Sequence, residues 1–121
     1  MITKFCAALA AVFVLILVAP AFAAETTIAG ELVDQACYLR DKAKNVGAEH
    51  RDCAMTCARK GLTVALVTDK GDVYAIRGVL AETGNTALVP HMSHKVELTG
   101  EVTENDGKKT ITATALKMLK M

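Results

Sequence analysis

Apolar and polar residues alternate over most of the C-terminal half of the chain, as in strands that bury one face of a sheet. Short segments rich in glycine, asparagine and aspartate separate the alternating runs and predict turns, most clearly at 105–107. The expected strands are 26–34, 62–68, 72–77, a brief one at 87–90, 96–102 and 110–115. The last two flank the clearest turn, so we expect them to pair as an antiparallel hairpin.

One segment follows a helical pattern instead, from about residue 48 to residue 60. Glu49 suits the positive N-terminal end of this helix, and Arg59 and Lys60 suit its negative C-terminal end. Gly61 follows as a residue that readily adopts the left-handed conformation in which helices end. Both ends of the helix are therefore marked in the sequence.

This series of elements predicts a mostly β fold with one helix, which belongs to the α+β class. Five to six short strands, with the helix inserted after the first, favour a small, partly open, OB-like barrel. A small α+β roll is the alternative. The sequence shows no internal repeat, so residues 24–121 are expected to form a single β-rich domain.

Residues 1–23 have the pattern of a signal peptide. Lys4 supplies a positive charge, a continuous apolar or small run covers 5–18, and Ala21-Phe22-Ala23 follows as a cleavage signature. The run is shorter than the roughly 20 apolar residues of a membrane-spanning helix, although a retained N-terminal anchor is the alternative. We therefore expect a periplasmic or secreted protein with no membrane span in the mature chain.

The charge balance excludes some partners. The whole chain has 14 basic and 13 acidic residues, and Lys4 is the only charged residue of the leader. The mature protein is thus formally neutral, which gives no electrostatic basis for binding nucleic acid. It also has two tyrosines and no tryptophan, so it offers little surface on which bases stack.

The chemistry of the chain is concentrated in residues 37–57, which contain three of its four cysteines and one of its three histidines. The ligand-type residues have the spacing C-x12-H-x2-C-x3-C and are Cys37, His50, Cys53 and Cys57. In a helix over 48–60, the last three would share one face, which we expect to point inward together with Ala54 and Ala58.

Three chemistries fit this cluster. Three thiolates and one imidazole suit tetrahedral zinc, and two thiolates with one imidazole suit copper(I), so a bound copper or zinc ion is one hypothesis. A structural disulfide that joins Cys37 to Cys53 or Cys57 is the second, because export exposes thiols to oxidation. Thiol–disulfide exchange is the third.

Two further places carry ligand-type residues. His91 and His94 flank Met92 and could bind copper or add a ligand to the cysteine cluster, although a solvated loop is the more common role of such histidines. Asp34 could orient His50 from behind, but its position favours a role at the end of the first strand. Met118 is expected in the core or in the C-terminal tail.

The motifs Asp34-x2-Cys37-Tyr38-Leu39 and His50-x2-Cys53-Ala54-x2-Cys57-x3-Gly61, followed by Val73-Tyr74, give the chain a family resemblance. It resembles a family of small exported bacterial proteins of unsettled function. The resemblance implies a leader followed by one OB-like or similar β-rich domain, with the Cys/His cluster acting as a unit. It implies no substrate.

Catalytic motifs are missing from the sequence. Ser93 is the only serine, and the chain has no glycine-rich phosphate loop and no paired-carboxylate pattern. We therefore expect an exported metal-binding carrier, buffer or partner-binding module, with a metal ion and another exported protein as partners, and not an enzyme. The rivals are a disulfide-stapled adaptor and a thiol–disulfide redox protein.

Overall fold

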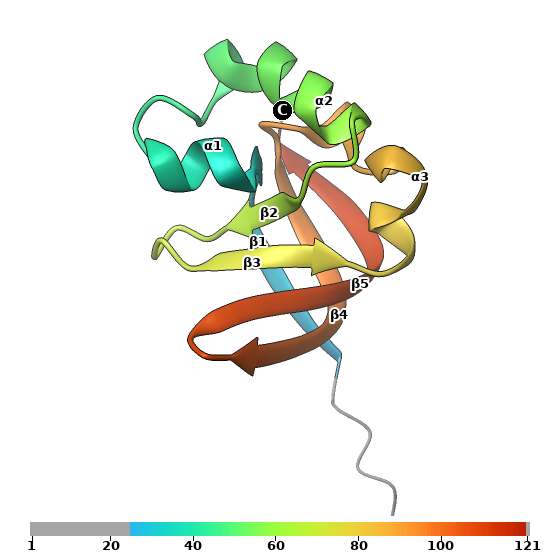
Figure 1. Ribbon diagram of the computed structural model, residues 1–121. Helices are drawn as coiled ribbons and strands as arrows, with labels where there is room; N and C mark the ends of the chain where they lie inside the picture. Colours follow the sequence, from blue (N-terminus) through green and yellow to red (C-terminus); the bar gives the residue numbers. More distant parts are fainter. Residues whose placement is uncertain (1–24, 121) are drawn as a thin grey trace, which may run out of the picture.

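The computed structural model describes residues 25–120, so the predicted leader lies outside the described part of the chain (Figure 1). Five strands form one mixed sheet, in the order β1-β2-β3-β5-β4. They are β1 (Glu25–Asp34), β2 (Val64–Val67), β3 (Val73–Arg77), β4 (Lys95–Asn105) and β5 (Lys108–Lys120). The predicted class, mostly β with added helix, is confirmed.

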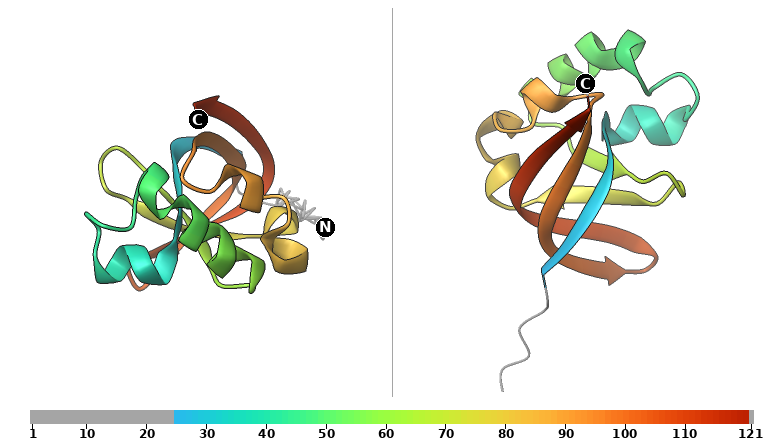
Figure 2. Two further views of the ribbon diagram at one scale, coloured as in Figure 1. Left: turned by 90° about the horizontal axis from the view of Figure 1, so that it is seen from above. Right: turned by 180° about the vertical axis from the view of Figure 1, so that it is seen from behind.

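The sheet closes on itself, because β4 pairs with both β5 and β1. All neighbours are antiparallel except β3 and β5, which run parallel over Tyr74–Arg77 and Lys109–Thr112. The barrel is therefore closed, where the sequence predicts a partly open one. The long strands β1, β4 and β5 wrap around its axis, as the rear view in Figure 2 shows.

Glycine allows two strands to approach their neighbours closely. A Cβ on Gly30 would overlap the carbonyl oxygen of Val67, and a Cβ on Gly100 would overlap that of Thr112. Gly100 also follows a shift in the β4–β5 register, as at a β-bulge. The curvature of the barrel thus depends on positions that have no side chain.

The barrel interior forms the main core, and the alternation along β4 and β5 determines which side chains enter it. Val96, Leu98, Ile111 and Ala113 are buried, while the threonines between Ile111 and Ala115 are exposed. The largest apolar side chains of the core are Leu32, Leu66, Ile76, Leu88, Met92, Leu98 and Ile111. Burying each contributes about 1.5–3 kcal/mol.

The predicted hairpin is confirmed, since β4 and β5 pair directly across Asp106-Gly107, with Gly107 at φ +75°. The brief strand predicted at 87–90 is wrong. Leu88 and Val89 are buried there in an irregular segment that includes the 3-10 turn η3 (Val89–His91). Pro90 lacks the N–H that a strand ladder needs, and it suits the first turns of a helix instead.

Helices cover one end of the barrel. The segment 48–60 contains the 3-10 turn η1 (Ala48–His50) and helix α2 (Arg51–Arg59), and Gly61 follows at φ +83°. A second helix, α1 (Gln35–Arg40), directly follows β1, where the sequence analysis predicts no helix. The remaining short pieces are η2 (Val79–Ala81) and α3 (Glu82–Asn85).

Helices α1 and α2 lie together at the end of the barrel opposite the β4–β5 turn (Figures 1 and 2). This arrangement brings the start of α1 close to α2, although a loop separates them in sequence. None of the helices within 25–120 is long and apolar enough to cross a membrane.

Candidate functional site

The junction of β1 and α1 places a carboxylate beside a thiol. Asp34 is only 2% exposed, and its Oδ2 atom accepts a hydrogen bond from the main-chain N–H of Cys37 at 3.0 Å. Asp34 is thus the N-cap of α1, and a side chain at the N-cap commonly accepts the N–H three residues later. The Asp-x2-Cys spacing produces this contact directly.

The carboxylate also affects the thiol. A hydrogen bond to Asp34 raises the pKa of Cys37 to about 11, and burial contributes in the same direction. The guanidinium of Arg40, whose nitrogen lies 3.5 Å from the Cys37 sulfur, acts in the opposite direction. Cys37 is therefore a protonated thiol at neutral pH.

Helix α2 contributes the other two thiols. Burial raises the pKa of Cys57, and the negative charge of Asp34 and the neighbouring Cys53 raise it further. Cys57 in turn raises the pKa of Cys37. The three thiols thus form one connected series in which Cys37 and Cys57 lie near Asp34 and Cys53 lies next to Cys57.

The predicted orientation of α2 is wrong for Cys53, which is exposed, whereas Cys57 is half-buried. Ala54 and Ala58 are the buried residues of this helix. They stand one turn apart, and their small side chains allow the helix to lie close against the barrel. The sulfur atoms therefore lie to the side of the buried face and not within it.

His50 is the last residue of η1 and precedes α2. Its Nε2 atom is buried and has no hydrogen-bond partner in the described structure. Within residues 25–120, no group of three His, Cys, Asp or Glu side chains is arranged to hold a metal ion, and the three cysteines are free thiols. A metal ion would therefore require side chains of the cluster to rotate toward it.

His91 and His94 have other neighbours. The Nδ1 atom of His91 lies 3.1 Å from the sulfur of Met118 on β5, a contact that the sequence does not predict. Burial lowers the pKa of His94, and the adjacent Arg51 and His91 contribute, so its imidazole is neutral at pH 7. Met92, which separates the two histidines in sequence, is fully buried in the core and is unavailable as a ligand.

This arrangement favours some chemistries over others. A thiolate is the species that attacks a disulfide, so thiols with raised pKa values exchange slowly at neutral pH. A metal ion, by contrast, binds thiolates by displacing their protons. The buried carboxylate of Asp34 lies beside these thiols but is absent from the predicted ligand set. Its position three residues before Cys37 is the sequence signal for the contact, because an aspartate at the N-cap commonly accepts the N–H of that residue.

The chain was compared with protein-family models, with curated proteins and with solved structures, and none of them matches it. The resemblance to a family of small exported bacterial proteins therefore stays a prediction.

Proposed function

We propose that this protein is exported to the periplasm or secreted, and that it binds a copper(I) or zinc ion through Cys37, Cys53 and Cys57. It acts as a carrier or buffer for the ion, which it passes to another exported protein, and not as an enzyme. The observation that supports this function is that the free thiols of Cys37 and Cys57 both lie near the buried carboxylate of Asp34, with the free thiol of Cys53 next to Cys57.

The ligand set explains features that a disulfide leaves unused. A single disulfide would use two thiols and leave the third without a role. Three thiolates suit copper(I), and three thiolates with an imidazole suit zinc. His50 would be the fourth ligand, since its Nε2 atom is buried and lacks a partner in the described part of the chain.

The negative charge of Asp34 also fits a cation. Its Oδ1 atom is buried and accepts no hydrogen bond from the described residues. A buried carboxylate oxygen without a partner costs free energy, and a cation bound directly to that oxygen would offset the cost. The thiolates around the ion have the same sign of charge as Asp34, so a direct bond between Asp34 and the metal, and not the net charge of the site, is what favours the ion over a disulfide.

We further propose that the closed barrel is OB-like. The strand order β1-β2-β3-β5-β4 and the parallel β3–β5 pair support this assignment. We also propose that His91 forms a separate, weaker copper site with His94 or with Met118, because an imidazole and a thioether are both ligands that copper accepts.

The test of the main site is a titration of the reduced protein with copper(I) and with zinc under a competing chelator. We expect one tightly bound ion per chain, bound much more weakly in Cys37→Ser and Cys57→Ser and moderately more weakly in Cys53→Ser and His50→Ala. His91→Ala is the matched control, because it removes an imidazole outside the cluster and should leave the tight site intact.

The alternatives give different results. Two oxidised cysteines in the isolated protein, with no stoichiometric binding after reduction, would leave a disulfide-stapled adaptor as the answer. Rapid exchange of that disulfide with glutathione would instead favour a redox protein. Counting free thiols with and without a chelator separates these cases.

A further inference from the structure

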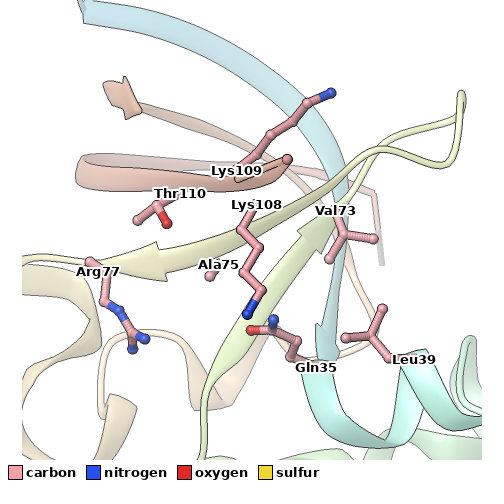
Figure 3. Close-up of a pocket in the computed structure, with 9 residues that line it drawn as sticks. Gln35, Leu39, Val73, Ala75, Arg77, Lys108, Lys109 and Thr110 are labelled. Atoms are coloured by element: carbon pink, nitrogen blue, oxygen red, sulfur yellow. The ribbon is translucent and has the colours of Figure 1, made fainter. Parts of the chain in front are cut away.

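A second site lies away from the cysteines, on the side of the barrel where α1, β3 and the β4–β5 turn meet (Figure 3). It is a pocket of about 440 Å³, lined on its floor by Ala75. Binding sites for small molecules commonly measure about 300–1,000 Å³. The pocket is therefore large enough for a small ligand.

Two positive charges of this pocket are not neutralised. Arg77 and Lys108 both line it, and neither forms an ion pair or a side-chain hydrogen bond within residues 25–120. Lys109 differs, because its Nζ atom lies 2.9 Å from Asp72 and 5.6 Å from the ring centroid of Tyr74. In Figure 3 the Lys109 side chain points away from the pocket, whereas that of Lys108 enters it.

A neutral polar side chain, that of Gln35, lies at the positively charged end of the pocket. The amide of Gln35, from the first turn of α1, lies beside the end of the Lys108 side chain in Figure 3. No aspartate or glutamate is among the described residues that line the pocket. An anion could therefore receive hydrogen bonds from an ammonium, a guanidinium and an amide without meeting a like charge.

The other end of the pocket is apolar. Leu39 and Val73 lie together on the side away from Arg77 in Figure 3, and Leu39 is 54% exposed. An exposed large apolar side chain is informative where it borders a cavity. The pocket thus combines a cationic end with an apolar end, a combination that fits an amphiphilic anion.

We propose that this pocket binds a small amphiphilic carboxylate, that is, a carboxylate attached to a short alkyl chain. The carboxylate binds between Arg77 and Lys108 and accepts a hydrogen bond from the side-chain amide of Gln35. The alkyl chain packs over Leu39, Val73 and Ala75. None of these residues belongs to the cysteine cluster, so binding of the carboxylate does not require a bound metal ion.

The test is a titration of the isotope-labelled, reduced protein with octanoate, octanol and acetate, followed by amide chemical shifts. Octanoate should move the amides around the pocket with one saturable affinity. Octanol, which lacks the charge, and acetate, which lacks the chain, should each bind at least about tenfold more weakly. Equal binding of octanoate and octanol, or of octanoate and acetate, would overturn the proposal.

Variants test the named residues. Arg77→Gln and Lys108→Gln should each weaken octanoate binding about tenfold, because each removes one charge-assisted hydrogen bond. Leu39→Ser should weaken octanoate binding while leaving acetate unaffected. Lys117→Gln, an exposed lysine of β5 outside the pocket, is the matched control and should bind octanoate as the natural protein does. Unchanged binding in Lys108→Gln and Arg77→Gln would reject this site.

Discussion

The carboxylate of Asp34 accepts the main-chain N–H of Cys37 at 3.0 Å and also raises the pKa of the Cys37 thiol to about 11. One side chain therefore begins helix α1 and keeps the nearest thiol protonated. The two roles come from the same position, because a residue at the N-cap faces the residue three places later. They can be separated by a substitution that keeps the cap and removes the charge.

Asp34→Asn is that substitution. Asparagine is as good an N-cap as aspartate, so we expect the fold to be retained. Loss of the negative charge should lower the pKa of Cys37 from about 11, so that its alkylation by iodoacetamide becomes fast at a lower pH. The measurement is the rate of alkylation against pH in the Cys53→Ser/Cys57→Ser background.

Asp52→Asn serves as the control, because Asp52 is an exposed carboxylate on α2. It should leave the alkylation profile of Cys37 in place. A profile that is the same in Asp34→Asn and in the natural protein would show that Asp34 does not control this thiol.

The hairpin illustrates what the sequence predicts well. Val96, Leu98, Ile111 and Ala113 alternate with polar residues, and all four are buried. The pattern needs only local information, since a period of two and a turn sequence define both strands and their pairing. The end of α2 at Gly61 was predictable for the same reason.

The rest depends on contacts between distant segments. The closure of the barrel by β1 and β4, and the parallel pairing of β3 with β5, have no local signal. Ala54 and Ala58 face the barrel as predicted, whereas Cys53 is exposed, because the extent of the buried face of α2 depends on how the helix packs. The partners of His91 and His94 likewise depend on how Met118 and Arg51 are brought to them by the fold.

The turn of the hairpin gives a second prediction. Gly107 has φ +75°, and a Cβ at this position would meet no atom within 4 Å. Gly107→Val should therefore destabilise the protein through backbone conformation alone, by about 1–2 kcal/mol or somewhat more because valine is β-branched. Chemical denaturation measures the change in the free energy of unfolding.

Thr103→Val is the matched control for this turn, since it introduces the same side chain at an exposed position of β4. It should change the free energy of unfolding by less than about 0.5 kcal/mol. An unchanged stability of Gly107→Val would mean that the turn has a different conformation.

The C-terminal end of α2 depends on a buried amide. Asn85 is 4% exposed, and its Nδ2 atom donates to the carbonyl oxygens of Ala58 and Leu62, each at 2.9 Å. Asn85→Ala leaves both carbonyls without this donor and places alanine at φ +57°. The free energy of unfolding should therefore fall by about 2–4 kcal/mol. Glu82→Ala, at an exposed neighbouring position, should melt within a few degrees of the natural protein.

The last prediction concerns protons and follows from the proposed metal site. The pKa of Cys37 is raised to about 11 and that of Cys57 is raised above its ordinary value, so both thiols carry protons at neutral pH. A metal ion binds thiolates, and each thiol that becomes a ligand must lose one proton. The apparent affinity for the ion should therefore rise with pH, by about tenfold per pH unit for each thiol proton displaced, as long as the pH stays below the pKa of that thiol.

Proton release is measured by calorimetric titration of the reduced protein in buffers with different ionisation enthalpies. Cys37→Ser should release one proton fewer per bound ion than the natural protein, because the Cys37 thiol is protonated before the ion binds. Metal binding that releases no protons would exclude Cys37 and Cys57 as ligands, since both are protonated before the ion arrives. The ion would then be bound elsewhere, and the pair of His91 and Met118 would be the next site to test, because an imidazole and a thioether are both ligands that copper accepts.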